Sequence, residues 1–289
     1  MTETDKSMMN ATRVKLADAQ AHIAAPAIEF KDITCSFPDR KKKAGLYTAL
    51  RDTTLNVQPG EFVSVVGPTG CGKSTLLNLA SGLIQASSGE IRIFGESLCG
   101  LNLRAGYMFQ GDSLMPWRTA LSNVMVGLEF AGKDAAVAKS LAMDWLVRVG
   151  LTGFEHAYPH HLSGGMCKRV ALAQMLILGP KILLMDEPFC ALDIQTRQLM
   201  EDELLELWSA DRKSVLFITH DLDEAIAMSD RVIVISAGPG AHPIGEFTID
   251  LPRPRNVAEI RNLPEFAQLH SKIWAAMKEE VLKGYAQRH

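Results

Sequence analysis

A glycine-rich run at residues 67–74 constrains the fold of this chain more than any other feature. It reads GPTGCGKS and fits the pattern G-x-x-x-x-G-K-[ST]. A short apolar run at 62–66 precedes it, and an apolar stretch of helical length at 74–83 follows. A strand, a glycine-rich loop and a helix in this order form the context in which the pattern binds phosphate groups. We therefore predict a phosphate-binding loop here.

Such a loop directs its backbone N–H groups at a polyphosphate, its lysine reaches the β and γ oxygens, and the next hydroxyl binds Mg²⁺. The alternative is a glycine-rich turn with an incidental lysine, which the flanking strand and helix disfavour. We expect ATP and Mg²⁺ as cofactors. The residues expected to bind the nucleotide here are Gly67, Pro68, Thr69, Gly70, Cys71, Gly72, Lys73, Ser74 and Thr75.

The thiol of Cys71 allows two interpretations. Its place near a helix N-terminus could lower its pKa and make it reactive. Alkylation would then inhibit ATP hydrolysis, and bound ATP would protect the thiol. The favoured interpretation is a small side chain that fills space.

Several apolar runs lack the polar alternation of a half-exposed strand. They lie at 62–66, 182–185, 215–218 and 232–235. Continuous apolarity is typical of strands that are buried on both faces of a parallel sheet. Amphipathic stretches of helical length alternate with them, at 74–83, 135–149, 165–178 and 197–209. We therefore predict an α/β fold with a mostly parallel core sheet flanked by helices.

Two carboxylates, Asp186 and Glu187, follow the apolar run at 182–185. A strand that ends there would place both at the carboxyl edge of the sheet, where nucleotides bind. Asp186 would hold Mg²⁺ through water, and Glu187 would orient or deprotonate the attacking water. The alternative is an acidic N-cap for the following helix, which the upstream phosphate loop disfavours.

Composition narrows the class of protein. Thirty basic against thirty-three acidic side chains give a net charge of −3, which disfavours a protein that coats nucleic acid. Five cysteines without a C-x-x-C pair are typical of reduced thiols in a cytoplasm. Residues 1–10 lack a secretory apolar core, and polar residues interrupt the apolar stretch at 170–185, so we expect no membrane span.

Further motifs stand in a fixed order around these two. LSGGM at 162–166 lies upstream of Asp186, Gln110 lies between the phosphate loop and LSGGM, and ALD at 191–193 and His220 follow Glu187. Together with the phosphate loop and the acidic strand, this set closely resembles the ATP-binding-cassette (ABC) family over about residues 27–240. Several motifs in one order are far more specific than a single motif.

The resemblance implies a P-loop NTPase fold with an antiparallel β subdomain and an α-helical signature subdomain at about 111–178. It implies that Glu187, His220 and Gln110 are catalytic, and that Ser74, Gln110 and Asp186 hold the metal. Phe37 would lie under the adenine, with Tyr47 as the alternative. It further implies a two-fold dimer in which ATP lies between the phosphate loop of one chain and the signature of the other. The residues expected to reach the partner's nucleotide are Ser163, Gly164, Gly165 and Asp193.

Within this family, LMPWRT at 114–119, DEPFCALD at 186–193 and LPRPR at 251–255 are similar to the ATPase subunits of bacterial nitrate, sulfonate, taurine and bicarbonate importers. This resemblance implies an ATP hydrolase that powers import from the cytoplasmic face of the inner membrane, as a peripheral subunit. Its partners would be a second copy or a homologous ATPase subunit, two transmembrane permease subunits and, indirectly, a periplasmic or lipid-anchored solute-binding protein. No nucleic acid partner is expected, and the solute is not specified.

The chain departs from the subgroup pattern at Met166, Gln174 and Cys190, where glutamine, arginine and glycine are usual. These departures remove no phosphate ligand, so we expect hydrolysis to be retained. One alternative function is an ABC-type ATPase of DNA repair or chromosome handling, which would need a long coiled-coil insertion before the signature. Another is a nucleotide-dependent regulator without turnover, which an intact Glu187 and His220 disfavour.

The remaining segments carry expectations about organisation. We predict a mobile leader at 1–26, a nucleotide-binding domain at 27–240 and a C-terminal part at 241–289 with a Pro-rich segment and a helix from 257 to about 287. A charged stretch at 39–43 is interpreted as a hairpin loop. Residues 112–119, which include Trp117, form either an exposed apolar groove for a membrane partner or part of the core.

Overall fold

The computed structural model describes residues 25–38, 45–111, 113–190 and 192–286. Nearly all of the expected leader and the charged loop at 39–43 lie outside the described residues. The expected boundaries at residues 26 and 240 stay predictions. No helix within the described ranges combines the length and the apolar character that crossing a bilayer requires.

The central sheet of the described chain contains six strands in the order β10-β9-β3-β8-β7-β6. Every neighbouring pair is parallel except β10 with β9. The strands are β3 (Phe62–Val66), β6 (Ala105–Met108), β7 (Ile182–Asp186), β8 (Ser214–Ile218), β9 (Arg231–Ile235) and β10 (Pro243–Thr248). The prediction of a mostly parallel core sheet is confirmed.

Successive side chains along a strand point to opposite faces of the sheet, and both faces of this sheet are buried. One face packs against α5 (Gly164–Leu176), α6 (Ile194–Ala210), α7 (Leu222–Met228) and α9 (Pro264–Ala286). It carries Phe62, Val66, Leu183, Met185, Val215, Phe217, Val232 and Val234. The other packs against α2 and the second sheet and carries Val63, Val65, Ile182, Leu184, Leu216, Ile218, Ile233 and Ile235. Continuous apolarity in the sequence therefore reflects two cores that share one sheet.

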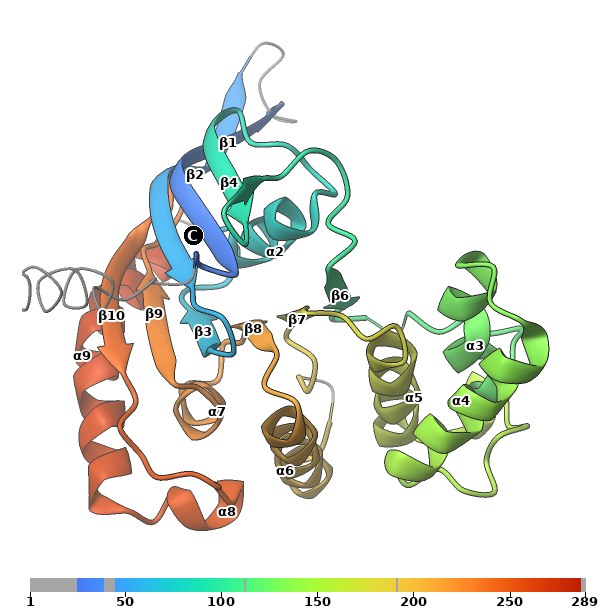
Figure 1. The fold of residues 1–289 in the computed structure, drawn as a ribbon. Coiled ribbons are helices and arrows are strands. Elements are labelled where there is room, and N and C mark those ends of the chain that lie inside the picture. Colours follow the sequence, from blue (N-terminus) through green and yellow to red (C-terminus); the bar gives the residue numbers. More distant parts are fainter. Residues whose placement is uncertain (1–24, 39–44, 112, 191, 287–289) are drawn as a thin grey trace, which may run out of the picture.

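A second, antiparallel sheet lies over α2 (Lys73–Ser81), as Figure 1 shows. Its strands follow the order β2-β1-β4-β5. They are β1 (Ile28–Pro38), β2 (Leu46–Val57), β4 (Ser88–Ile93) and β5 (Glu96–Ser97). This sheet is the antiparallel layer that the family resemblance implies.

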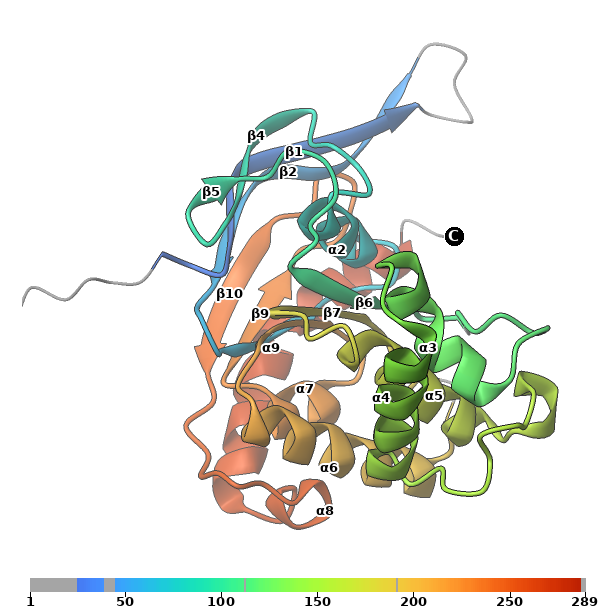
Figure 2. The ribbon, with the colours of Figure 1, turned by 45° about the vertical axis from the view of Figure 1, so that its right-hand side comes forward.

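A group of helices is inserted between β6 and β7 and lies beside the central sheet (Figure 2). It comprises α3 (Ala120–Phe130), α4 (Ala135–Arg148), the 3₁₀ turn η1 (Pro159–His161) and α5 (Gly164–Leu176). Side-chain oxygens of Thr119, Asp134 and Ser163 accept backbone hydrogen bonds at the starts of α3, α4 and α5. Polar caps therefore fix where each helix begins.

The helices after β7 agree with the sequence expectation at α6, which was expected at 197–209, but differ from it near the C-terminus. They are α6 (Ile194–Ala210), α7 (Leu222–Met228), α8 (Val257–Ile260) and α9 (Pro264–Ala286). The single helix expected from 257 to about 287 is wrong, because the chain breaks between α8 and α9. Pro264 starts the second helix, a position that suits a residue without an N–H. Strand β10, which the sequence did not indicate, precedes the Pro-rich segment.

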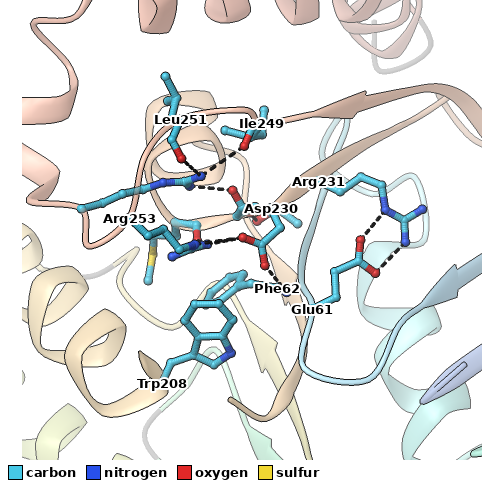
Figure 3. A network of polar contacts seen from close by, with 12 residues as sticks. Glu61, Phe62, Trp208, Asp230, Arg231, Ile249, Leu251 and Arg253 are labelled. Atoms are coloured by element: carbon cyan, nitrogen blue, oxygen red, sulfur yellow. Dashed lines mark hydrogen bonds and ion pairs between the residues drawn. The ribbon is translucent and has the colours of Figure 1, made fainter. Parts of the chain in front are cut away.

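The arginines of LPRPR fix the Pro-rich segment to the body of the protein. Asp230 accepts hydrogen bonds from Arg253 Nε at 2.9 Å and from the Phe62 backbone N–H at 3.0 Å, and the Arg253 guanidinium lies 4.3 Å from the centre of the Trp208 ring (Figure 3). Arg255 is buried and donates to the carbonyl oxygens of residues 226, 227, 229, 249 and 251. Burial lowers the pKa of Arg255 to about 10, so its guanidinium stays charged at neutral pH.

Candidate nucleotide-binding site

Residues 67–72 connect β3 to α2, and α2 begins at Lys73. Gly70 and Gly72 have φ angles of 82° and 105°, a region that side chains disfavour. A Cβ on Gly67 would lie 2.8 Å from the carbonyl oxygen of Ile235, so only glycine allows β9 to approach this closely. The backbone path of the loop therefore requires glycine at these three positions.

The Lys73 ammonium folds back over the loop. Its Nζ donates to the carbonyl oxygens of Gly67 at 2.8 Å and Pro68 at 3.0 Å. Lys73 is buried, so its charge sits inside the loop and is only weakly screened by solvent. A buried ammonium held in this way can bind the oxygens of a phosphate group.

A cavity of about 460 Å³ opens at the loop. Its size lies in the range of small-molecule sites, about 300–1,000 Å³. It brings together most of the predicted site residues from distant parts of the sequence. The lining residues are Phe37, Tyr47, Ala49, Thr69, Gly70, Gly72, Lys73, Ser74, Thr75, Gln110, Glu187 and His220.

The three residues predicted to be catalytic meet at one carboxylate. Gln110 Nε2 donates to Glu187 Oε2 at 3.1 Å, and His220 Nδ1 lies 3.1 Å from the same oxygen. Glu187 has a φ of 44°, a left-handed conformation that costs a non-glycine residue about 1 kcal/mol or more. The Glu187 backbone N–H donates to the carbonyl of Ile218 at 2.8 Å, which fixes this conformation at the end of β7. The carboxylate is thus held at the edge of the cavity.

Asp186 lies beside the loop and shares a hydrogen bond with the Ser74 hydroxyl. Burial raises the pKa of Asp186, while the Ser74 hydrogen bond and the Lys73 charge oppose that shift. A hydroxyl and a carboxylate fit Mg²⁺, which prefers oxygen ligands and commonly takes one or two carboxylates together with phosphate oxygens. Within the described ranges no three His, Cys, Asp or Glu side chains could hold a metal by themselves. The donor set therefore suits Mg²⁺ that arrives with a nucleotide.

Both candidates for the adenine contact line the cavity. Phe37 and Tyr47 are cross-strand partners on β1 and β2. Phe37 is half-buried, and Tyr47 is 40% exposed. Either ring could stack on a base, so the two alternatives stay predictions.

The signature residues lie apart from this cavity. Ser163 caps α5 and Asp193 caps α6, and neither lines the cavity around the loop of its own chain. A Cβ on Gly165 would lie 2.7 Å from Cγ2 of Thr196, so the starts of the two helices touch each other. Ser163, Gly164 and Asp193 are exposed. If these residues bind a nucleotide, that nucleotide must come from another chain.

The departures from the subgroup pattern leave the loop and the carboxylates in place. Met166 packs against the core of the helical layer, and Gln174 is half-buried. The Cys190 sulfur lies 3.8 Å from Gln110 Nε2, close to the contact with Glu187. Burial raises the pKa of the Cys71 thiol, which favours the space-filling interpretation of that residue over the reactive one.

Some residues that support the site were missed from the sequence. Lys168 on α5 is buried and its Nζ donates to the carbonyl oxygen of Gln110 at 2.8 Å. Arg197 on α6 pairs with Asp221 at 3.1 Å, directly after His220. Each contact joins residues that are far apart in the chain, so no local pattern could have indicated it.

A parallel sheet whose strand β3 leads through a G-x-x-x-x-G-K-S loop into α2, with two carboxylates at the end of β7, defines a P-loop nucleoside triphosphatase. A model of the ABC transporter family matches residues 50–190. An uncharacterized ABC transporter ATP-binding protein of Methanocaldococcus jannaschii is 46% identical over 236 residues, 81% of this chain and 86% of that protein. The chain therefore belongs to the ABC transporter ATP-binding proteins, which are ATP hydrolases that drive transport.

Other relatives agree with this assignment. The nitrate import ATP-binding protein NrtD of Synechocystis sp. is 42% identical over 241 residues, 82% of this chain and 90% of that protein. A solved dimeric ATP-binding cassette in a post-hydrolysis state, bound to ADP and Pi, has a TM-score of 0.68 and 31% identity. That likeness covers 78% of this chain and 100% of the solved one. The predicted family, fold class and hydrolase activity are confirmed.

Proposed function

We propose that this chain is the ATP-hydrolysing subunit of a bacterial importer for a small anion or sulfonate-type solute, of the nitrate, sulfonate, taurine or bicarbonate class. The observation that carries the proposal is the Glu187 carboxylate, held by Gln110 and His220 at the cavity beside the phosphate loop. The importer assignment is supported by the similarity to nitrate import ATP-binding proteins. The choice among the four solute classes rests on the sequence resemblance.

In the proposed reaction, Lys73 binds the β and γ oxygens of ATP and the backbone N–H groups of residues 67–75 surround the phosphates. Glu187 orients or deprotonates the attacking water, and His220 contacts the γ-phosphate. Ser74, Gln110 and Asp186 would hold Mg²⁺, which would neutralise charge on the phosphate oxygens. The hydrogen bond from Gln110 Nε2 to Glu187 leaves the amide oxygen of Gln110 as the candidate ligand.

We propose a dimer, of two copies or of this chain with a homologous ATPase subunit, in which each nucleotide contacts both chains. Ser163, Gly164, Gly165 and Asp193 would reach the γ-phosphate bound to the partner's loop. The exposed start of α5 supports this role, because free N–H groups and the positive end of the helix dipole favour an anion. ATP that bridges two chains would bind the closed dimer more tightly and so drive closure.

The segment after Gln110 is the proposed contact with the membrane partners. Trp117 is 73% exposed, so the interpretation of this residue as core is wrong, whereas Leu114 is buried. The exposed Trp117 ring, seven residues after Gln110 in the chain, offers apolar area that a partner could cover. We propose that two permease subunits dock here, that the chain lies peripherally on the cytoplasmic face of the inner membrane, and that a solute-binding protein acts indirectly.

We also propose the domain division at 27–240, with a helical subdomain at about 111–178, between a leader and a C-terminal part.

The chain between α2 and Ser163 disfavours the alternative function of a chromosome-handling ATPase. Between α2 and Ser163, where only residue 112 is undescribed, the longest helix is α4 with 14 residues. That length is too short for the coiled coil such proteins need.

The test has two parts. The chain, tagged at its N-terminus, is isolated from solubilised membranes of its own host, and we expect a polytopic membrane protein in stoichiometric amount. The purified complex, with its solute-binding protein, is then assayed for phosphate release with nitrate, taurine, an alkanesulfonate or bicarbonate. Glu187→Gln should lower phosphate release by about 100-fold or more, whereas Glu279→Gln, on the exposed side of α9, should not. Recovery with nucleic acid or repair proteins instead would overturn the proposal.

A further inference from the structure

The end of α9 touches the phosphate loop. Figure 1 shows α9 beside β9 and β10. A Cβ on Gly284 would lie 3.1 Å from Cβ of Pro68. Glycine inside a helix costs stability relative to alanine, so a glycine at the point of closest approach has a steric reason to be there.

A second contact joins α9 to the loop through a turn. Oε2 of the buried Glu280 accepts a hydrogen bond from the backbone N–H of Ala237 at 2.7 Å. The next residue of that turn lies against the loop, because a Cβ on Gly238 would lie 3.6 Å from both Cα of Cys71 and the carbonyl oxygen of Gly70. The turn after β9 is therefore held between α9 and the phosphate loop.

The same helix shares a cavity with His220. Beside the contact of Gly284 with Pro68, α9 and the loop enclose a cavity of about 260 Å³. Its lining residues are Gly67, Pro68, Thr69, His220 and, on α9, Trp274, Met277, Val281 and Gly284. This cavity shares Thr69 and His220 with the nucleotide cavity, which Lys73, Ser74 and Glu187 also line. Gly67 and Pro68 line the cavity beside α9 and not the nucleotide cavity, and we call this part of the loop its outer wall.

The contacts of Glu280 and Gly284 differ from those that attach the helix. Phe266, Ile273 and Met277, in the earlier turns, are buried in the main core and hold α9 against the sheet. Glu280 and Gly284 instead meet the turn and the loop. A substitution at either position can therefore change the loop while leaving the attachment of the helix intact.

We propose that Glu280 and Gly284 are positioning residues that hold the outer wall of the phosphate loop and thereby set the affinity for ATP. This inference rests on the proposed nucleotide site. Glu280 fixes the turn that supports Gly70 and Cys71, and Gly284 sets how far Pro68 can move outward. Neither residue lines the nucleotide cavity, so the effect is on the shape of the loop before binding.

The first test compares three variants of the full-length chain. Glu280→Ala removes the acceptor, Glu280→Gln restores a carbonyl oxygen for the Ala237 N–H, and Glu279→Ala is an exposed control on the same turn. The Kd for ADP is measured by calorimetry, and KM and kcat for ATP by phosphate release. We expect Glu280→Ala to raise Kd and KM about threefold to tenfold with kcat within about twofold. Glu280→Gln and Glu279→Ala should stay within about twofold of the wild type.

The second test separates positioning from stability. Gly284→Ala improves helix propensity, so a purely structural role predicts an unchanged or higher melting temperature and unchanged nucleotide affinity. Positioning predicts that the added methyl pushes Pro68 and raises Kd about threefold or more at an unchanged or higher melting temperature. Wild-type affinity in both Glu280→Ala and Gly284→Ala would overturn the inference. If the wild type itself bound neither ADP nor ATP, the proposed function would fail instead.

Discussion

Replacing Arg255 by methionine removes the group that binds the carbonyl oxygens at the end of α7 and in the Pro-rich segment. Three of these contacts go to Ser229 at 2.6 Å, Leu251 at 3.1 Å and Ile249 at 3.2 Å. A buried carbonyl that loses its partner costs about 1–3 kcal/mol. Because water can enter near the partly exposed ends of the segment, we expect a loss of about 3–5 kcal/mol, near the lower end of the sum for three such carbonyls.

The assay is urea unfolding followed by circular dichroism, together with the melting temperature, which should fall by about 6–15 °C. Arg255→Lys keeps the charge but offers fewer donors, so it should lose less, and it serves if the methionine variant is insoluble. Arg92→Met, at an arginine whose side chain is 40% exposed and paired with Glu90, is the matched control and should leave the melting temperature unchanged. An Arg255→Met protein within about 1 kcal/mol of the wild type would refute the reasoning, because one orphaned carbonyl alone should cost that much.

Lys168→Met should lower kcat about threefold to tenfold with little change in KM, because the backbone of Gln110 loses its ammonium partner; steady-state phosphate release checks this. Burial raises the pKa of Glu224 to about 8, so the folded state keeps a proton that the unfolded state releases near pH 4.5. Stability should therefore fall between about pH 4.5 and 8 by up to about 1.4 kcal/mol per pH unit, and Glu224→Gln should flatten that slope in urea unfolding. Cys71 should react with iodoacetamide much more slowly than the exposed Cys99, with or without ATP; equal labelling by mass spectrometry would contradict this.

The sequence predicted the central sheet well because its strands are buried on both faces. Strands β3, β7, β8 and β9 therefore contain apolar runs, which only Ser64 in β3 interrupts. The edge strands escaped prediction for a physical reason. Strand β6 is only Ala-Gly-Tyr-Met, and β10 alternates between half-buried and exposed positions. Neither pattern distinguishes a strand from coil without its neighbour.

The candidate site also contains features that the sequence predicted and features that it did not. The loop and the two carboxylates of β7 could be predicted because local spacing and the order of the motifs identify them. The contacts of Lys168 with Gln110 and of Glu280 with Ala237 could not, since each joins distant segments through a backbone atom. A hydrogen bond to a backbone atom requires no particular residue type at that position, so the sequence carries no signal of it. Helix α7 was also missed, because a seven-residue helix gives too few turns for a periodic signal.

The strand order has a consequence for the synthesis of this chain. Strand β3, which leads into the phosphate loop, pairs only with β8 and β9 in the central sheet. Both partners leave the ribosome long after β3, and β6, the next strand of that sheet to be made, lies at the far edge. Strand β3 must therefore wait, with both of its edges unpaired, until residues 214–235 arrive. Chaperones that shield such strands should matter more for the folding of this chain than for one built from hairpins.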